Sequence, residues 1–562
     1  MKRILLLLLC FLFVFSASAS TFEIEEDYTV TVDKNALLAA LYEADISSLR
    51  QAIDLGLISC QELTEYYLER IEAYNDTFQC FITLCDNAVE VAKQRDAALA
   101  KGNVRGSLFG IPIVVKDNIE YEGYPTTNGY AYANRAPSEK NAAVVQHLLD
   151  EGAVILGKTN MSAGAQDAIC STNAAGLQTF NAYNPNLASG GSSGGSAVAV
   201  CLNFAAAGLG TDTNVSLRYP SALNGCVSLR PTFDLVDNEG CILLNQKRDT
   251  VGAITRTVVD QAIMLDAMTG SSYSENLNEN ALDGMRIGIL AEFSYPVQEI
   301  GFRSDDTLDD EIQAAFDQAV EELTMCGAEV VTVSIPTIFN DIANSSSPSD
   351  RLYAQLETLL DENNLSAIIY PTYLHTPHYT TKEYLDGKNI YALPYICNCA
   401  TFSPLTGAPE ITVPIGTHST GAGIGMEILS LKNNDQLLLD IAYSYTKKYD
   451  HRASSSAAPS LYVGDMELTL HAFLMLYEQA LEAAETQKAA ATEPTTIEPT
   501  ESTEETTASA PAEDDSENVS SDASLAWLWY IIAVVVVLFS CGVFYIVKRR
   551  KISPVASSES SE

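Results

Sequence analysis

One lysine and two serines have the residue types from which a hydrolytic site could be built. Lys116 ends the apolar run GIPIVVKDNI, so its stem is predicted to lie in the protein interior. Burial disfavours the charged ammonium and lowers a lysine pKa, which turns the side chain into a base. Ser192 lies in GGSSGGSAVAV and Ser216 in GLGTDTNVSLRYPSALNGCVSLRPT, and either hydroxyl could serve such a base. The structural alternative is a lysine that only covers the end of a strand with its stem.

The run that contains Ser192 holds four glycines and three serines before a stretch of small apolar residues. Glycine weakens helices and strands, so this density predicts a loop that must approach other backbone closely. The small residues Ala197 to Val200 are predicted to begin a helix packed beneath that loop. A phosphate-binding loop is the structural rival, but no lysine follows in the position that such a loop requires.

Two other patterns are set aside on physical grounds. The segment from Gly152 to Thr159 fits GxxxxGK[ST], but its variable positions read Ala-Val-Ile-Leu, which is strand material and not a flexible phosphate loop. The six histidines form no HExxH pattern, and no GxSxG elbow is present. A hydrolase with this sequence is therefore expected to use a base other than histidine.

Taken together, these segments resemble the amidase signature family, whose members hydrolyse carboxamide C–N bonds with a Ser-Ser-Lys triad. The resemblance covers most of the globular region and rests on motifs in the family's order: LFGIPIVVKDNI, GAVILGKTNMS, the Gly-Ser run, the Ser216 segment, GAITRTVVDQAIMLDAMTG, YPT and GAPEITVPIG. It implies that Lys116 is the base, that Ser192 follows a cis peptide bond and relays the proton, and that Ser216 is the nucleophile.

The same resemblance implies further roles. The relay would let Ser216 attack the amide carbonyl, return a proton to the leaving amine, and give an acyl-enzyme that water hydrolyses, with no metal or cofactor required. Backbone N–H groups of Thr213, Asn214 and Val215 would form the oxyanion hole. Asp212 and Arg218 would support the nucleophile loop structurally. The pocket would be approached by segments that contain the following residues: Met161, Thr126, Thr127 and Asn128.

The sequence departs from the family's TGGS at Thr213-Asn214-Val215-Ser216. If the second glycine needs a positive φ, Val215 would distort the oxyanion hole, because a β-branched residue adopts that conformation only with strain. Two hypotheses follow: an active amidase with a reshaped acyl pocket, or a weakly active or inactive surface binding protein on an amidase fold. Retention of all three triad residues favours the enzyme. A third interpretation, the glutaminase subunit of a tRNA-dependent amidotransferase, is disfavoured by the targeting segments described below.

Helical and strand patterns alternate along the chain. A capping box at Ser59 predicts a helix through Tyr74, and AAVVQHLLDEG predicts a helix that runs into the strand AVILG. Short strands are predicted in MRIGILAEF, AEVVTVSIP, SAIIYPT and PEITVPIG, and helices in DDEIQAAFDQAVEELTMCG and NDQLLLDIAYSYTKKY. This alternation predicts an α/β fold, a single large domain over 37–487 with a mixed, largely parallel central sheet covered by helices.

The ends of the chain and its charge bear on location and partners. Residues 1–19 read as a secretory signal peptide, 488–524 as a disordered Thr/Glu/Pro/Ser stalk, 525–547 as a transmembrane helix and 548–562 as a cytoplasmic tail. The basic residues after 547 predict that the amidase domain faces outward.

A net charge of −41 in 562 residues argues against a nucleic-acid partner. The expected partners are the membrane, through the C-terminal helix, and a small-molecule or peptide amide. Many cysteines lie in apolar runs and are expected to be buried thiols, with no specific disulfide predicted.

Overall fold

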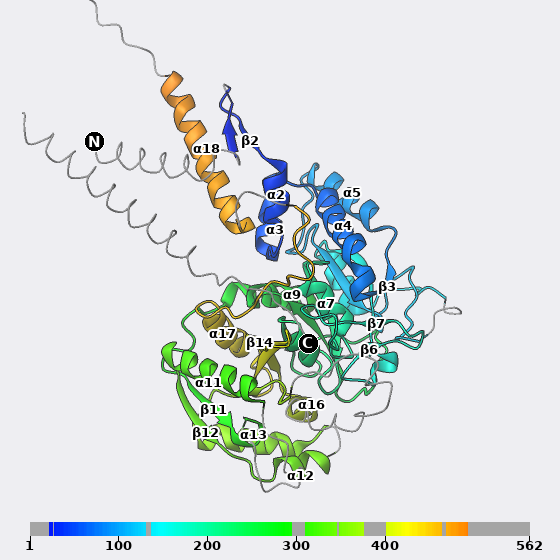
Figure 1. The fold of residues 1–562 in the computed structure, drawn as a ribbon, viewed down its shortest axis with the longest axis vertical. Helices are drawn as coiled ribbons and strands as arrows, with labels where there is room; N and C mark the ends of the chain where they lie inside the picture. The colour runs from blue at the N-terminus through cyan, green and yellow to red at the C-terminus, as the bar shows by residue number, and fades with distance from the viewer. Residues whose placement is uncertain are drawn as a thin grey trace, which may run out of the picture. The chain divides into compact units, whose positions relative to one another are not determined.

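A single large sheet runs through the part of the chain that carries the predicted motifs (Figure 1). The computed structural model describes residues 22–25, 27–130, 136–294, 309–345, 348–375, 401–462 and 468–492. The sheet has 11 strands in the order β12-β11-β13-β15-β14-β9-β10-β8-β4-β5-β3. In chain order these strands are β3 (Phe81–Leu84), β4 (Pro112–Lys116), β5 (Val154–Thr159), β8 (Ala207–Asp212), β9 (Val227–Arg230), β10 (Thr250–Thr255), β11 (Arg286–Leu290), β12 (Glu329–Val333), β13 (Ala367–Pro371), β14 (Glu410–Thr417) and β15 (Gly423–Leu429).

The sheet is mixed, but the prediction that it is largely parallel is wrong. Among the described strands, the parallel pairs are β12–β11, β11–β13, β8–β4 and β4–β5. Every neighbouring pair from β13 across to β8 is antiparallel, and so is β5–β3. One reason is a short turn between β14 and β15, closed by His418 N–H donating to the Ala422 carbonyl at 2.8 Å. A turn of this length joins antiparallel neighbours only, since a parallel pair needs a long crossover.

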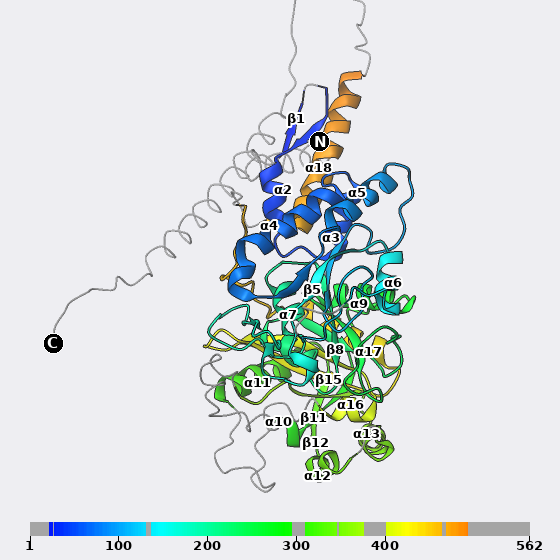
Figure 2. The same ribbon diagram turned by 90° about the vertical axis from the view of Figure 1, so that its right-hand side faces the viewer.

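Helices pack against this sheet and at both of its ends. Figure 2 shows α2 to α5 gathered at the end with β5, and α12, α13 and α16 gathered at the end with β11 and β12. The helices are α2 (Lys34–Ala40), α3 (Ile46–Asp54), α4 (Cys60–Phe78), α5 (Ala88–Leu99), α6 (Ala143–Asp150), α7 (Gly194–Cys201), α8 (Arg218–Leu223), α9 (Val258–Thr269), α10 (Ala291–Ser294), α11 (Asp310–Met325), α12 (Ile338–Ala343), α13 (Asp350–Glu362), α16 (Phe402–Thr406), α17 (Asp435–Thr446) and α18 (Leu470–Thr492), with short 3₁₀ turns at Ala163–Ala165 and Ser274–Asn276.

Helix α4 shows how local sequence sets an element. The Ser59 side chain accepts a hydrogen bond from the Glu62 N–H, and the Glu62 carboxylate accepts one from the Ser59 N–H, so the predicted capping box is confirmed. The helix continues to Phe78, past the expected end at Tyr74, and stops at Gln79 in a left-handed conformation.

Secondary structure continues on both sides of the range 37–487. Strands β1 (Phe22–Ile24) and β2 (Val30–Val32) precede it, and α18 extends to Thr492 and packs against α2, α3 and both of these strands. Two further short strands, β6 (Ser171–Thr172) and β7 (Gln178–Thr179), form a small separate sheet.

Several predictions about the chain ends fall outside the part of the chain that the structure describes. These are the signal peptide, the transmembrane helix, the cytoplasmic tail and the stalk from 493 onward. Among the described residues, no helix combines the length and the apolar character needed to cross a bilayer. The eight described cysteines are free thiols, and all but Cys241 are buried.

Candidate active site

Lys116 lies at the end of β4 with its side chain fully buried. Its Nζ donates to three hydroxyl oxygens: Ser192 Oγ at 2.7 Å, Ser193 Oγ at 2.8 Å and Thr211 Oγ1 at 2.8 Å. Burial lowers the pKa of Lys116 to about 7, although Asp212 and Asp249 act in the opposite direction from a greater distance. The amine is therefore half neutral near neutral pH, and a neutral amine beside a hydroxyl can accept its proton.

The Gly-Ser run forms the turn that leads into α7. The Gly191–Ser192 peptide bond is cis. A Cβ on Gly194 would lie 2.4 Å from Ser189 Oγ, and one on Gly195 would lie 2.3 Å from the Asn160 carbonyl oxygen. No larger residue fits at either position, so the glycines serve the close backbone approach that their density predicts. The helix itself is buried along its whole length, as expected for small residues packed beneath a site.

Ser216 lies in the turn between β8 and α8, and it is 6% exposed. Its carbonyl accepts a hydrogen bond from the Ser193 N–H at 3.0 Å, which holds the turn against the Gly-Ser loop. Among the described residues, the Ser216 hydroxyl forms no hydrogen bond, and none joins it to Ser192. The structure therefore brings Lys116 and Ser192 into direct contact and holds Ser216 beside them through the backbone. Catalytic hydrogen bonds are often long in free enzymes, so this geometry leaves the role of Ser216 a prediction.

The segment before Ser216 presents unpaired backbone donors. In the described part of the chain, the N–H groups of Thr213, Asn214, Val215 and Ser216 form no hydrogen bond, although Thr213, Val215 and Ser216 are buried. Buried N–H groups are normally paired, so a run without partners is unusual. Neither Asn214 nor Val215 has a positive φ. The backbone here does not demand glycine, and the strain anticipated at Val215 is absent.

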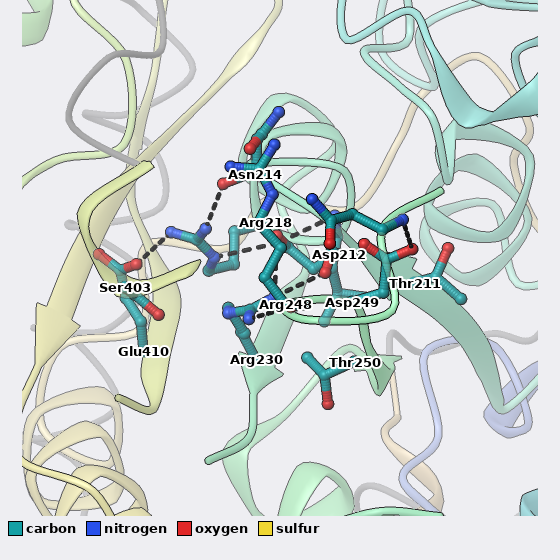
Figure 3. Close-up of polar contacts among 12 residues, drawn as sticks. Thr211, Asp212, Asn214, Arg218, Arg230, Arg248, Asp249, Thr250, Ser403 and Glu410 are labelled. Atoms are coloured by element: carbon teal, nitrogen blue, oxygen red, sulfur yellow. Dashed lines mark hydrogen bonds and ion pairs between the residues drawn. The ribbon is translucent and has the colours of Figure 1, made fainter. Parts of the chain in front are cut away.

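A buried charge network supports the turn that contains Ser216 (Figure 3). Asp212 Oδ2 accepts hydrogen bonds from Arg218 Nε at 3.2 Å and from the Leu217 N–H at 3.2 Å, and Arg230 lies 3.4 Å from Asp212 Oδ1. Burial would raise the pKa of Asp212, but the two arginines outweigh it and hold that pKa below its usual value. The guanidinium of Arg218 also donates to the Asn214 carbonyl at 2.7 Å. These contacts are the ones that a structural role of Asp212 and Arg218 requires, and that role stays a prediction.

Two buried glutamates complete the network around Arg218. Glu410 forms an ion pair with Arg218 and accepts a hydrogen bond from the Tyr370 hydroxyl, and Glu427 lies 3.5 Å from Arg218. Burial raises the pKa of both carboxyls, to about 7 for Glu427, with Arg218 opposing the shift. The charge of Glu427 adds to the rise in the pKa of Glu410, so ionisation of one carboxyl disfavours ionisation of the other.

The predicted pocket residues fall into two contacting segments. Thr127 is buried, and its hydroxyl and N–H both donate to the Asp117 carboxylate. These bonds fix the loop that contains Thr127 to the residue after β4. The Asn128 carbonyl accepts from the Gly164 N–H at 2.9 Å, which places the loop against the turn that follows Met161. Met161 is fully buried. The structure thus brings these residues together, but in the described part of the chain no hydrogen bond joins them to Ser216.

Comparison with known proteins identifies the family of the chain. The model of the family described as Amidase matches residues 62–347, half of the chain. The chain belongs to the amidase family. This family member is 28% identical over 495 residues to a glutamyl-tRNA(Gln) amidotransferase subunit from Caldanaerobacter subterraneus subsp. tengcongensis, covering 74% of this chain and 99% of that protein. The corresponding amidotransferase subunit from Lawsonia intracellularis is 36% identical over 292 residues, 50% of this chain and 58% of the relative.

Solved amidase structures share the fold. The native peptide amidase from Stenotrophomonas maltophilia superimposes with a TM-score of 0.63 at 26% identity, covering 75% of this chain and 99% of that one. The structure of the peptide amidase PAM in complex with the competitive inhibitor chymostatin gives a TM-score of 0.61, also at 26% identity. This amidase family member therefore has the α/β fold of the family, with helices around a large mixed sheet.

Sequence reasoning missed several residues of the site. Ser193 and Thr211 contact Lys116 as closely as Ser192 does, and Arg230, Glu410 and Glu427 complete the network around Asp212 and Arg218. Ser193 and Thr211 adjoin predicted site residues, so adjacency could have found them. The two glutamates stand within apolar runs of β14 and β15, where an isolated carboxylate is a signal for a buried ion pair.

Proposed function

We propose that this chain hydrolyses a carboxamide C–N bond through Lys116, Ser192 and Ser216. The observation that carries the proposal is the Lys116 amine, with a pKa of about 7 and 2.7 Å from Ser192 Oγ. A buried amine held near neutrality beside a serine is suited to general base catalysis at physiological pH. Membership of the amidase family gives the reaction class, and the residue roles are our inference.

The mechanism follows from the residue types. Neutral Lys116 takes the Ser192 proton while Ser192 takes the Ser216 proton, and Ser216 Oγ forms a bond to the amide carbon. The negative charge that develops on the carbonyl oxygen meets the free N–H groups between Thr213 and Ser216, where each donor can contribute ~3 kcal/mol to the transition state. The proton returns along the same path to the leaving nitrogen as the C–N bond breaks. Water, deprotonated by the same relay, then attacks the acyl carbon. The bond from this carbon to Ser216 Oγ breaks, the relay returns the proton to Ser216 Oγ, and the acid is released.

The alternative is a weakly active or inactive binding protein with the same fold. Its motivation was the Asn214-Val215 pair in place of two glycines. Two observations now favour the enzyme: neither residue has a positive φ, and the local N–H groups are unpaired within the described ranges. Side-chain changes leave backbone donors in place when the backbone conformation is kept, so an oxyanion hole is compatible with this sequence.

The proposed substrate is an external amide, either a peptide amide or a small amide used as a nitrogen source. The likeness to a peptide amidase supports the first, and the predicted signal peptide, stalk and membrane helix support an outward-facing site. The full-length relatives named as amidotransferase subunits support the other interpretation, in which ammonia passes to a second subunit. That interpretation predicts activity only with partner subunits, whereas ours predicts hydrolysis by the purified chain alone.

A serine-reactive probe and an amide panel test the proposed chemistry together. We expect a fluorophosphonate to label the purified full-length chain and ammonia or amine to be released from at least one amide. Ser216→Ala should remove both signals, while Ser419→Ala, an exposed serine outside the site, should keep them. Folded protein that is neither labelled nor active would support the binding alternative. Labelling that persists in Ser216→Ala would assign the nucleophile elsewhere.

The outward orientation has its own test. Protease added to intact cells should release the domain by cleavage in the predicted stalk from 493 to 524, because a segment of this composition is expected to be accessible to protease. A domain that is protected until the cells are broken would contradict an outward-facing site.

A further inference from the structure

Arg248 lies at the edge of the candidate site, across from the predicted oxyanion segment. Strands β8 and β10 are antiparallel, with Thr250 opposite Asp212. Asp249 and Thr213 continue this register, because the Thr213 side chain contacts the Asp249 carboxyl. One step further, the register places Arg248 opposite Asn214, two residues before Ser216, and Figure 3 shows Arg248 next to Asn214. No catalytic or supporting role described above uses the Arg248 side chain.

The Arg248 guanidinium has no partner among the described residues. Its carbonyl accepts a hydrogen bond from Arg230, but its side-chain nitrogens form no hydrogen bond or ion pair in that part of the chain, and Nε is buried. The two other arginines near the site differ from Arg248 in this respect, because Arg218 and Arg230 both form ion pairs with Asp212. Partial burial without a partner is unfavourable for a cation. It lowers the pKa of Arg248, although the negative charges of Asp249 and Asp212 act to raise that pKa.

Neither nearby carboxylate, Asp212 or Asp249, forms an ion pair with Arg248 among the described residues. Asp212 is shared by Arg218 and Arg230, and Asp249 Oδ2 accepts hydrogen bonds from the Leu244 and Asn245 N–H groups. Asp249 Oδ1 is buried without a hydrogen-bond partner among the described residues, and no ion pair in that part of the chain joins it to Arg248. The terminal nitrogens of Arg248 therefore remain available to a group from outside the chain. Guanidinium presents two parallel donors that match a carboxylate, and such bidentate pairs fix both position and orientation.

We propose that Arg248 binds a carboxylate of the substrate, so that the preferred substrates are amides that carry a carboxylate a few bonds from the scissile carbonyl. This inference rests on the proposed amidase function and narrows its substrate class. Arg248 acts as a specificity residue: it attracts the anion and orients the amide carbonyl toward the N–H groups between Thr213 and Ser216.

Two substrates matched in carbon chain test the inference: succinamate, which carries a carboxylate, and butanamide, which does not. We expect the full-length chain to favour succinamate in kcat/KM by about 30-fold, as a charge-assisted hydrogen bond supports. Arg248→Gln should reduce that ratio to near one, and Arg248→Lys should retain part of it. Lys247→Gln removes a neighbouring exposed charge and should leave the ratio unchanged. A ratio that Arg248→Gln does not alter would overturn the proposal.

A binding measurement separates this inference from the proposed reaction. Succinate should bind the Ser216→Ala variant in titration calorimetry and bind Ser216→Ala/Arg248→Gln at least tenfold more weakly. Arg248-dependent binding without hydrolysis of any amide would refute the proposed reaction and leave the anion site standing. Amide hydrolysis combined with succinate binding that is absent or independent of Arg248 would refute the anion site alone.

Discussion

Two buried lysines, Lys116 and Lys158, stand on adjacent strands and have different surroundings. In the β4–β5 register Lys116 is opposite Thr159 and Lys158 is opposite Val115. Side chains alternate along strands, so the two lysines point to opposite faces of the sheet. Lys116 meets three hydroxyls, whereas Lys158 lies 3.8 Å from the Asp117 carboxylate and donates to Thr126 Oγ1 at 3.0 Å.

Under the proposed function, Lys116 is a base and Lys158 an anchor, and their partners differ more than their burial does. Burial lowers the pKa of both, to about 7 for Lys116 and to about 8 for Lys158, where Asp117 opposes the shift. The hydroxyls beside Lys116 can exchange protons with a neutral amine. The carboxylate beside Lys158 favours a charged amine, and that ion pair ties the Thr126–Thr127 loop to the end of β4. Lys158 is thus a positioning residue, and the P-loop pattern around it marks no phosphate site.

The largest expected effect comes from replacing each lysine by methionine, which keeps a side chain of similar length and removes the charge. Lys116→Met should lower kcat/KM for the best amide of the panel on the order of 10³-fold, since the general base is lost. Lys158→Met should lower it by roughly tenfold, because only the loop position changes. Steady-state ammonia release measures both. Equal losses in the two variants would remove the distinction between base and anchor.

A second expected effect concerns stability. Lys158→Met leaves Asp117 buried without its cation and should lower the free energy of unfolding by about 3 kcal/mol, as measured by urea denaturation. In Lys158→Met/Asp117→Asn the loss should be at least ~1 kcal/mol smaller than the sum of the single losses. Strictly additive losses would show that the two side chains do not act as a pair.

The pH dependence sharpens the comparison. Lys116 is protonated below about pH 7, so kcat/KM should fall about tenfold per pH unit below that midpoint and level off above it. Because the unfolded chain binds more protons at this group between pH 7 and its usual value of 10.5, the contribution of Lys116 to stability rises with pH over that window. Lys158→Met should keep the kinetic midpoint near 7. A midpoint that moves in this variant would assign the titration to Lys158.

The smallest expected effect concerns one hydroxyl beside each lysine. Thr211→Val removes an acceptor of the Lys116 amine and should lower kcat/KM by about tenfold, the value of one charge-assisted hydrogen bond. The matched change Thr126→Val removes an acceptor of Lys158 and should have a weaker effect on kcat/KM. Near-equal effects would indicate that the hydroxyls around Lys116 do not tune the base.

Local features were the part of the fold that sequence reasoning predicted well. The capping box at Ser59, the strand at 154–159 that excludes a P-loop and the strand ending at Lys116 all depend on neighbouring residues. The direction of the strands was not predictable in the same way. The short turn after β14 makes β15 antiparallel to it. Because no strand was predicted at Gly423–Leu429, the sequence analysis did not include this hairpin and assigned too much of the sheet as parallel.

The sequence by itself determined which residues are available for chemistry: a lysine at the end of an apolar strand, a serine pair among glycines, and a serine before Leu-Arg. These features are local, because they depend on residue type and on neighbours a few positions away. Only the tertiary structure decided which of two buried lysines meets hydroxyls and which meets a carboxylate. That outcome depends on sheet register and on the strands brought alongside, and such contacts join residues far apart in the chain whose pairing no short stretch of sequence encodes.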